Sequence, residues 1–149
     1  KKFCKKISTS FSGRRSRTTT LHETKYMVYA KNMKFLQADT FEWKDKQGYS
    51  KKIFLDEDDL KHPGVLVQMI KIKARDEAKS HFHKKQTEIF YFLNTNGHFT
   101  VDGEKITPKI GDIIVVEPYD KHIVTNDTDA DFLYLAFKIH YDENDSYWD

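Results

Sequence analysis

Short apolar runs separated by turns dominate the chain from residue 33 onward. The runs are rich in β-branched and aromatic residues, and several alternate between apolar and polar positions, as strands with one buried face do. The segments predicted to form strands are 52–55, 65–73, 88–93, 99–101, 104–106, 113–116, 122–125 and 132–141. Asp102-Gly103 separates two of them and predicts a two-residue hairpin turn. One short segment, 56–60, has the character of a helical turn.

The spacing of these runs indicates the fold class. Turn residues recur at intervals of about 8 to 12 residues, and no long segment has the helical period of apolar positions. The pattern predicts an all-β domain, built as an antiparallel sandwich or barrel. A chain of 149 residues is long enough for one such domain with its own hydrophobic core.

Charge divides the chain near Met33. Residues 1–32 contain nine Lys or Arg residues and one acid, a net charge of +8, whereas residues 33–149 carry −6. The first segment is also rich in Ser and Thr, so we predict a basic extension over 1–32 and a single barrel domain over 33–149. The extension could be a disordered arm, a transit peptide or a leader foreign to the native mature protein. A basic run alone is too unspecific to predict nucleic-acid binding.

Several classes of protein are excluded by what the sequence lacks. The single cysteine, Cys4, cannot form an intramolecular disulfide. No apolar run reaches the roughly 18 residues of a membrane span, and the first residues have no apolar core of a secretory signal. The expected location is the cytoplasm, or an organelle if the extension is a transit peptide.

The residues that carry chemistry begin with His81-Phe82-His83. Side chains alternate along a strand, so the two imidazoles point to one face and Phe82 to the other. Glu88 opens the next predicted strand after the loop 84–87, which fits a hairpin that would place Glu88 across from the histidines. That strand is apolar on both faces and is expected to be buried on both. A buried carboxylate needs a partner, and a metal ion would supply one.

A second motif adds His122. The sequence GDIIVVEPYDKH at 111–122 resembles the second motif of the cupin superfamily, which has a Gly-Asp pair, a proline turn and a histidine eleven residues after the glycine. The stretch from His81 to Gly97 resembles the first cupin motif, and the resemblance covers about residues 65–141. Three residues stand where cupins commonly have glycine: Arg75, Thr95 and Tyr119.

The resemblance implies a small single-domain cupin with a double-stranded β-helix, or jelly-roll, barrel. It also implies one divalent metal ion held by three histidines and one glutamate, which are His81, His83, Glu88 and His122. Imidazole and carboxylate ligands together suit Fe, Mn, Ni, Co, Cu or Zn. Four protein ligands leave positions open in an octahedron, which favours a reactive site over a structural one. Glu88 could also act as a base if it leaves the metal.

Aromatic residues near these ligands are candidates to line a pocket. Phe90 and Phe92 share the ligand face of their strand, and Tyr119 lies beside the turn that leads to His122. Tyr91 and Phe137 are expected in the core. The acidic tail 141–149 is expected to be a solvated end or to pack across a dimer partner.

The fold alone does not give the function, because cupins include enzymes, regulator domains and storage proteins. We expect a metalloenzyme of the dioxygenase or isomerase type acting on a small organic molecule. The alternative is a non-catalytic cupin that binds or senses a small molecule or a sugar. A homodimer is also expected, with segments 65–73 and 132–141 as candidate sheet edges that need cover.

Overall fold

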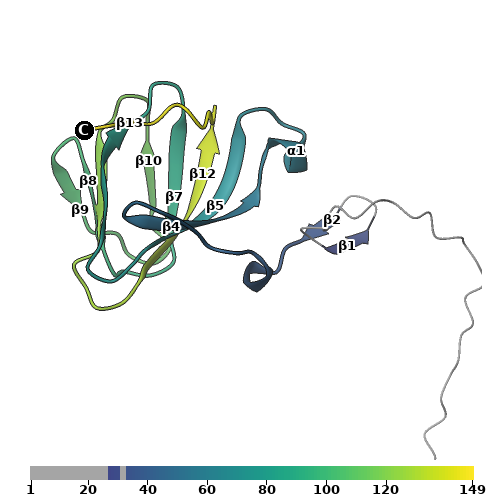
Figure 1. Ribbon diagram of the computed structural model, residues 1–149, viewed down its shortest axis with the longest axis horizontal. Helices are drawn as coiled ribbons and strands as arrows, with labels where there is room; N and C mark the ends of the chain where they lie inside the picture. Colours follow the sequence, from purple (N-terminus) through teal and green to yellow (C-terminus); the bar gives the residue numbers. More distant parts are fainter. Residues whose placement is uncertain (1–26, 31–32) are drawn as a thin grey trace, which may run out of the picture.

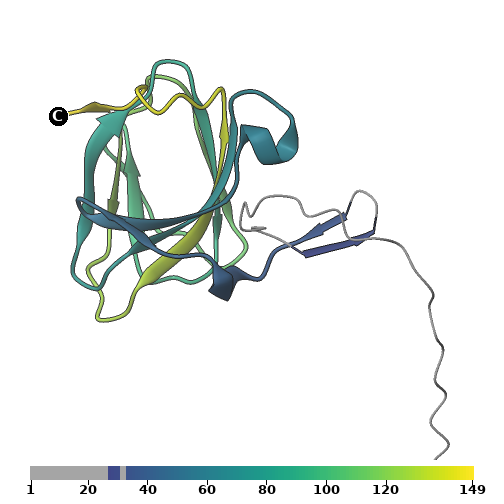
Figure 2. The same ribbon diagram turned by 45° about the vertical axis from the view of Figure 1, so that its right-hand side comes forward.

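The computed structural model describes residues 27–30 and 33–149. Residues 44–148 form two antiparallel sheets that face each other and enclose a barrel (Figure 1; Figure 2). Strands β1 (Met27–Ala30) and β2 (Met33–Phe35) pair with each other outside the barrel. The rest of the predicted basic extension, Cys4 included, lies outside the described residues. No helix in the described part of the chain is long and apolar enough to cross a membrane.

The strands of the two sheets come from residues 44–148. The larger sheet has the order β10 (Ile113–Val116), β7 (Thr87–Phe92), β12 (Phe132–Ile139), β5 (Val65–Ile72), β4 (Tyr49–Leu55) and β3 (Lys44–Lys46). The smaller sheet has the order β13 (Tyr147–Trp148), β6 (Glu77–Phe82), β11 (His122–Thr125), β8 (His98–Val101) and β9 (Glu104–Ile106). The strands pair in antiparallel fashion, as predicted for an all-β sandwich or barrel.

Two short helical elements connect the strands: η1 (Ala38–Thr40) and α1 (Glu57–Leu60). The helix α1 occupies the predicted helical turn. Its N-cap is Asp56, whose carboxylate accepts a hydrogen bond from the Asp59 N–H, while the Asp59 carboxylate accepts one from the Asp56 N–H. The helix ends at Lys61, which has a left-handed backbone with a φ of 56°.

Aromatic side chains from both sheets fill the barrel interior. The ring of Phe92 on β7 stacks 5.8 Å from that of Phe132 and meets that of Phe99, from the facing sheet, edge to face at 5.3 Å. Full burial of each such side chain stabilises the fold by about 2–3 kcal/mol. The ring of Phe90 lies 6.3 Å from that of His122, so the aromatic core packs against this histidine.

Gly97 lies where the chain passes close to this core. A Cβ atom at this position would lie 2.4 Å from Cδ1 of Phe132 and 2.7 Å from the carbonyl oxygen of Thr125. No side chain fits without a movement of the backbone, so the chain needs a glycine here.

The outer face of the larger sheet differs from the prediction. The strand β7 was expected to be buried on both faces, and Tyr91 and Phe137 were expected in the core. Instead Ile113 is 61% exposed, Val115 50%, Tyr91 38% and Phe137 36%. Apolar residues on both faces of a strand indicate two covered faces, but among the described residues no second layer covers the outer one.

The connection between β6 and β7 also differs from the prediction. Segment 84–87 was expected to be a hairpin loop, but β6 pairs with β11 and β13 whereas β7 pairs with β10 and β12. The loop therefore passes from one sheet to the other. His81 and Glu88 face each other across the barrel and not along one ladder.

Candidate metal centre

The barrel brings the four predicted ligand residues together. His81 lies on β6 and His122 at the start of β11, and the two residues are directly paired between these strands. His83 follows the end of β6, and Glu88 points inward from β7 in the opposite sheet. One ligand atom from each of the four residues lies within 4.8 Å of the others.

Backbone carbonyl groups fix the orientation of the three imidazole rings. In each ring the Nδ1 atom faces a carbonyl oxygen, so it is Nδ1 that carries the proton and donates. The partners are Lys79 for His81 at 2.9 Å, Asp145 for His83, and Asp120 for His122 at 3.1 Å. The neutral ring then has its lone pair on Nε2. Such carbonyl partners are typical of histidines that bind a metal through Nε2.

The Nε2 atoms meet the carboxylate of Glu88. Oε2 of Glu88 lies 3.4 Å from Nε2 of His83 and 3.2 Å from Nε2 of His122. Both Nε2 atoms are buried and lack a hydrogen-bond partner, and Glu88 is only 3% exposed. Lone pairs of two rings and a carboxylate oxygen thus converge on one buried point, where a cation would satisfy all three.

Glu88 is held in its charged form. Burial by itself would raise the pKa of this carboxyl, but the charge of the Lys138 ammonium group, the largest opposing cause, brings it well below its ordinary value. Lys138 is directly opposite Glu88 in the β7–β12 ladder, and its Nζ forms an ion pair with Oε1. An efficient general base has a pKa near the working pH, so this environment suits a ligand better than the base considered for Glu88.

His81 is held in its neutral form. Burial, followed by the neighbouring His122, lowers the pKa of His81 from 6.5 to about 3. Between these two pH values the unfolded chain binds more protons at this position than the folded chain does. We therefore expect the metal-free chain to become less stable as the pH falls from 6.5 to 5, with His81 contributing up to about 2 kcal/mol.

Urea unfolding of the metal-free chain across that pH range measures the effect. In His81→Gln the free energy of unfolding should depend less steeply on pH, because the titrating group is gone. His140→Gln is the matched control, since His140 lies on the exposed surface outside the cluster. An identical pH dependence in His81→Gln and the unchanged chain would mean that the folded state does not hold His81 neutral.

The C-terminal segment forms part of the site, which the sequence did not predict. The acidic tail was expected to be solvated or to cover a dimer partner, but β13 pairs with β6 of its own chain. The indole of Trp148 stacks on the ring of His81 at 4.3 Å. The buried Asp145 carboxylate accepts hydrogen bonds from three backbone N–H groups, those of Lys84, Lys85 and Gln86.

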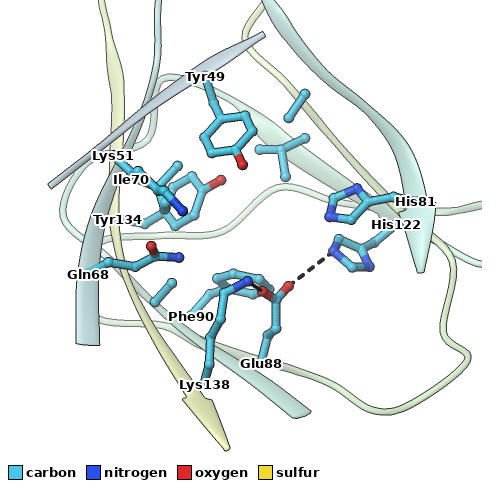
Figure 3. Close-up of a pocket in the computed structure, with 13 residues that line it drawn as sticks. Tyr49, Lys51, Gln68, Ile70, His81, Glu88, Phe90, His122, Tyr134 and Lys138 are labelled. Carbon is cyan, nitrogen blue, oxygen red and sulfur yellow. Dashed lines mark ion pairs between the residues drawn. The ribbon is translucent and has the colours of Figure 1, made fainter. Parts of the chain in front are cut away.

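A small cavity opens beside the four clustered residues. Its volume is about 50 Å³, and Figure 3 shows His81 and His122 on one side of it, with Tyr49, Lys51 and Gln68 opposite. The candidate lining residues are placed differently from one another. Phe90 lines this cavity. Phe92 lies in the aromatic core, completely buried, and Tyr119 is 66% exposed, with a φ of 76° that favours glycine.

Comparisons with known proteins agree with this architecture. Residues 68–138 match the cupin domain family. No curated protein matches the chain at a significant level. Among solved structures, a predicted oxalate decarboxylase from Thermotoga maritima is similar at 19% identity and a TM-score of 0.64, covering 69% of this chain and 96% of its own. KdgF from a Halomonas species is similar at 19% identity and a TM-score of 0.64, and the match covers 74% of this chain and 96% of KdgF. The polyketide cyclase RemF from Streptomyces resistomycificus is similar at 15% identity and a TM-score of 0.63, and the match covers 73% of this chain and 80% of RemF.

Proposed function

The chain contains a cupin domain with the double-stranded β-helix fold, and we propose that it binds one divalent transition-metal ion and acts with it on a small organic molecule. The ligands proposed are His81, His83, Glu88 and His122. The ion would be Fe, Mn, Ni, Co, Cu or Zn, since these metals accept imidazole and carboxylate together. The turnover proposed is of the dioxygenase or isomerase type.

One observation carries the metal site. Two buried Nε2 atoms face the same oxygen of Glu88 at 3.2 and 3.4 Å with no hydrogen-bond partner. Backbone carbonyls hold the protons of these rings on Nδ1, so the atoms that face the carboxylate offer lone pairs. Such an arrangement is costly to bury without a cation between the atoms.

The neighbouring side chains support a reactive site and not a closed structural one. When bound, a metal ion of this kind supplies Lewis-acid chemistry and, if it is redox-active, electron transfer. The cavity reaches His81, Glu88 and His122, so a small molecule inside it would lie beside the ligands. Lys138 keeps Glu88 in place and anionic by pairing with Oε1. Burial raises the pKa of Tyr134 well above its ordinary value, so its hydroxyl keeps its proton and can donate to a bound molecule.

The rival proposal is a non-catalytic cupin that binds or senses a small molecule or a sugar. The same cavity and the same ligands would serve it, so the identity of the metal discriminates between the two. Iron together with oxygen uptake would support a dioxygenase, whereas zinc without turnover would support binding or isomerisation. The similar structures include a predicted oxalate decarboxylase and a polyketide cyclase, which is compatible with catalysis.

Elemental analysis of the chain purified without added metal tests the proposal. We expect close to one divalent transition-metal ion per chain. A chain that has no metal when purified, and takes up none of the six candidate ions on dialysis, would overturn it.

We also propose a homodimer through the outer face of the larger sheet. The segments expected as sheet edges, 65–73 and 132–141, are interior strands, since β5 pairs with β12 and β4, and β12 with β5 and β7. The edge strands of this sheet are β10 and β3. The apolar face begins at β10, and its exposed members are Tyr91, Ile113, Val115, Phe137 and Ile139. These five carry no charge, so the face is complementary to a second copy of itself.

Sedimentation at micromolar concentration should therefore give the mass of two chains. Ile113→Asp should shift the mass to one chain, because it would bury a carboxylate within the interface. Ile106→Asp is the matched control, since Ile106 is exposed on β9 in the other sheet. A mass of one chain for the unchanged protein would contradict the proposal.

A further inference from the structure

The wall of the cavity opposite the metal ligands carries polar groups without protein partners. Within the described residues, the Lys51 ammonium group and the hydroxyls of Tyr49 and Tyr134 form no hydrogen bond or ion pair, and all three side chains line the cavity (Figure 3). Oε1 of Gln68 is buried there without a partner. Unpaired polar groups at this density are unusual in a protein interior unless a ligand pairs with them.

A second cavity adjoins the first. Its volume is about 310 Å³, and the two cavities share Tyr49, Lys51 and Lys138 as lining residues. The outer one is also lined by Lys46 and Lys79.

The charged residues that line the outer cavity are mostly positive. Its lining contains four lysines and one carboxylate, that of Glu143. The charge of Lys138 is already balanced by Glu88, so Lys46, Lys51 and Lys79 face Glu143 alone. A concave lining with a surplus of positive charge attracts anions and raises their local concentration.

We propose that the site takes a small organic dicarboxylate, with one carboxylate in the inner cavity between the metal ligands and Lys51 and the second among the lysines of the outer cavity. The inference rests on the proposed small-molecule site and adds the class of ligand. An inner volume of about 50 Å³ holds only a few groups of the size of water, which suits a carboxylate. Tyr49 and Tyr134 supply further donors to it. Burial lowers the pKa of Lys51, and a bound anion would compensate the cost of that burial.

Binding of malonate and succinate to the metal-loaded chain, measured by titration calorimetry, tests the proposal. We expect at least one of the two to bind, and the neutral malonamide and succinamide to bind at least about tenfold more weakly. Lys51→Met keeps the apolar stem and removes the charge, so it should weaken dicarboxylate binding by about tenfold or more. Lys51→Arg, which restores the charge, should recover most of it.

Lys105→Met is the matched control, because Lys105 is exposed on β9, away from both cavities. The metal content of every sample is measured as well, and it should be the same in Lys51→Met as in the unchanged chain. Equal affinity of diacids and diamides, an unaltered affinity in Lys51→Met, or no binding of either diacid to metal-loaded protein would each overturn the dicarboxylate proposal while leaving the metal site standing. A chain that takes up no metal would instead overturn the proposed function.

Discussion

Replacing His81 and His122 together by alanine is expected to leave the chain unable to hold its metal ion. The change removes two of the four ligands and leaves His83 and Glu88 alone at 3.4 Å. Loss of a single supporting partner of a ligand commonly costs 10- to 100-fold in affinity, so loss of two ligands should exceed roughly 100-fold. Metal content after dialysis and titration with zinc measure the loss.

The same double variant should lose the stabilisation that metal gives to the fold. An ion present at 100 times its dissociation constant stabilises the folded state by about 2.7 kcal/mol, because the unfolded chain cannot assemble the site. The melting temperature of the variant should therefore be the same with and without added zinc. A double variant of His62 and His140, which lie outside the cluster, is the matched control and should behave as the unchanged chain does. Full metal occupancy in the His81/His122 variant would mean that the ligands are assigned wrongly.

The cluster of His81, His83, Glu88 and His122 could be predicted from the sequence because two kinds of signal point to it. Alternation along a strand places His81 and His83 on one face. His122 is singled out by the resemblance of residues 111–122 to the second cupin motif. These signals do not depend on which strands become neighbours. The sheet partners of β6 and β7 do depend on that, and for this reason the expected hairpin between the histidines and Glu88 was wrong.

The exposure of the larger sheet could not be predicted for a similar reason. Apolar residues on both faces of a strand are typical of strands that are covered on both faces, but they do not show what covers them. Within one chain, the described residues cover the inner face alone, so Tyr91 on β7 and Ile113 and Val115 on β10 are exposed. The pattern that led us to expect β7 to be buried on both faces therefore supports the proposed partner for the outer face of this sheet.

No local feature of the sequence predicted that the C-terminal segment contacts the candidate metal site. The segment is short, acidic and without an apolar period, and such composition is typical of solvated ends. Its role depends on contacts across more than 60 residues of sequence, since Asp145 meets His83 and Trp148 meets His81. Contacts at this separation are set by the closed barrel and not by the sequence around them.

Asp145→Ala is the second change for which we expect a large effect. The Asp145 carboxylate accepts from three N–H groups of the loop 84–86, and its main-chain carbonyl accepts from Nδ1 of His83. Without the carboxylate three donors lose their partner, at a cost of about 1–3 kcal/mol for each that stays buried. The loop next to His83 should then shift relative to the Asp145 main-chain carbonyl that orients the His83 ring, and metal affinity should fall by roughly 10- to 100-fold.

The test combines urea unfolding with zinc titration, and the matched control is Asp142→Ala, an acid of the same segment that forms an ion pair with Lys85 at 3.6 Å. Burial alone would raise the pKa of Asp145, but the three N–H groups bring it below 3.8. Its contribution to stability is therefore fully present above pH 3.8 and is lost as the pH falls through the lowered value. Near neutral pH the whole effect of Asp145→Ala should be visible, and Asp142→Ala should change stability by less than about 1 kcal/mol. If Asp145→Ala keeps full zinc affinity, His83 is oriented by the barrel itself, and the C-terminal segment serves only to cover the site.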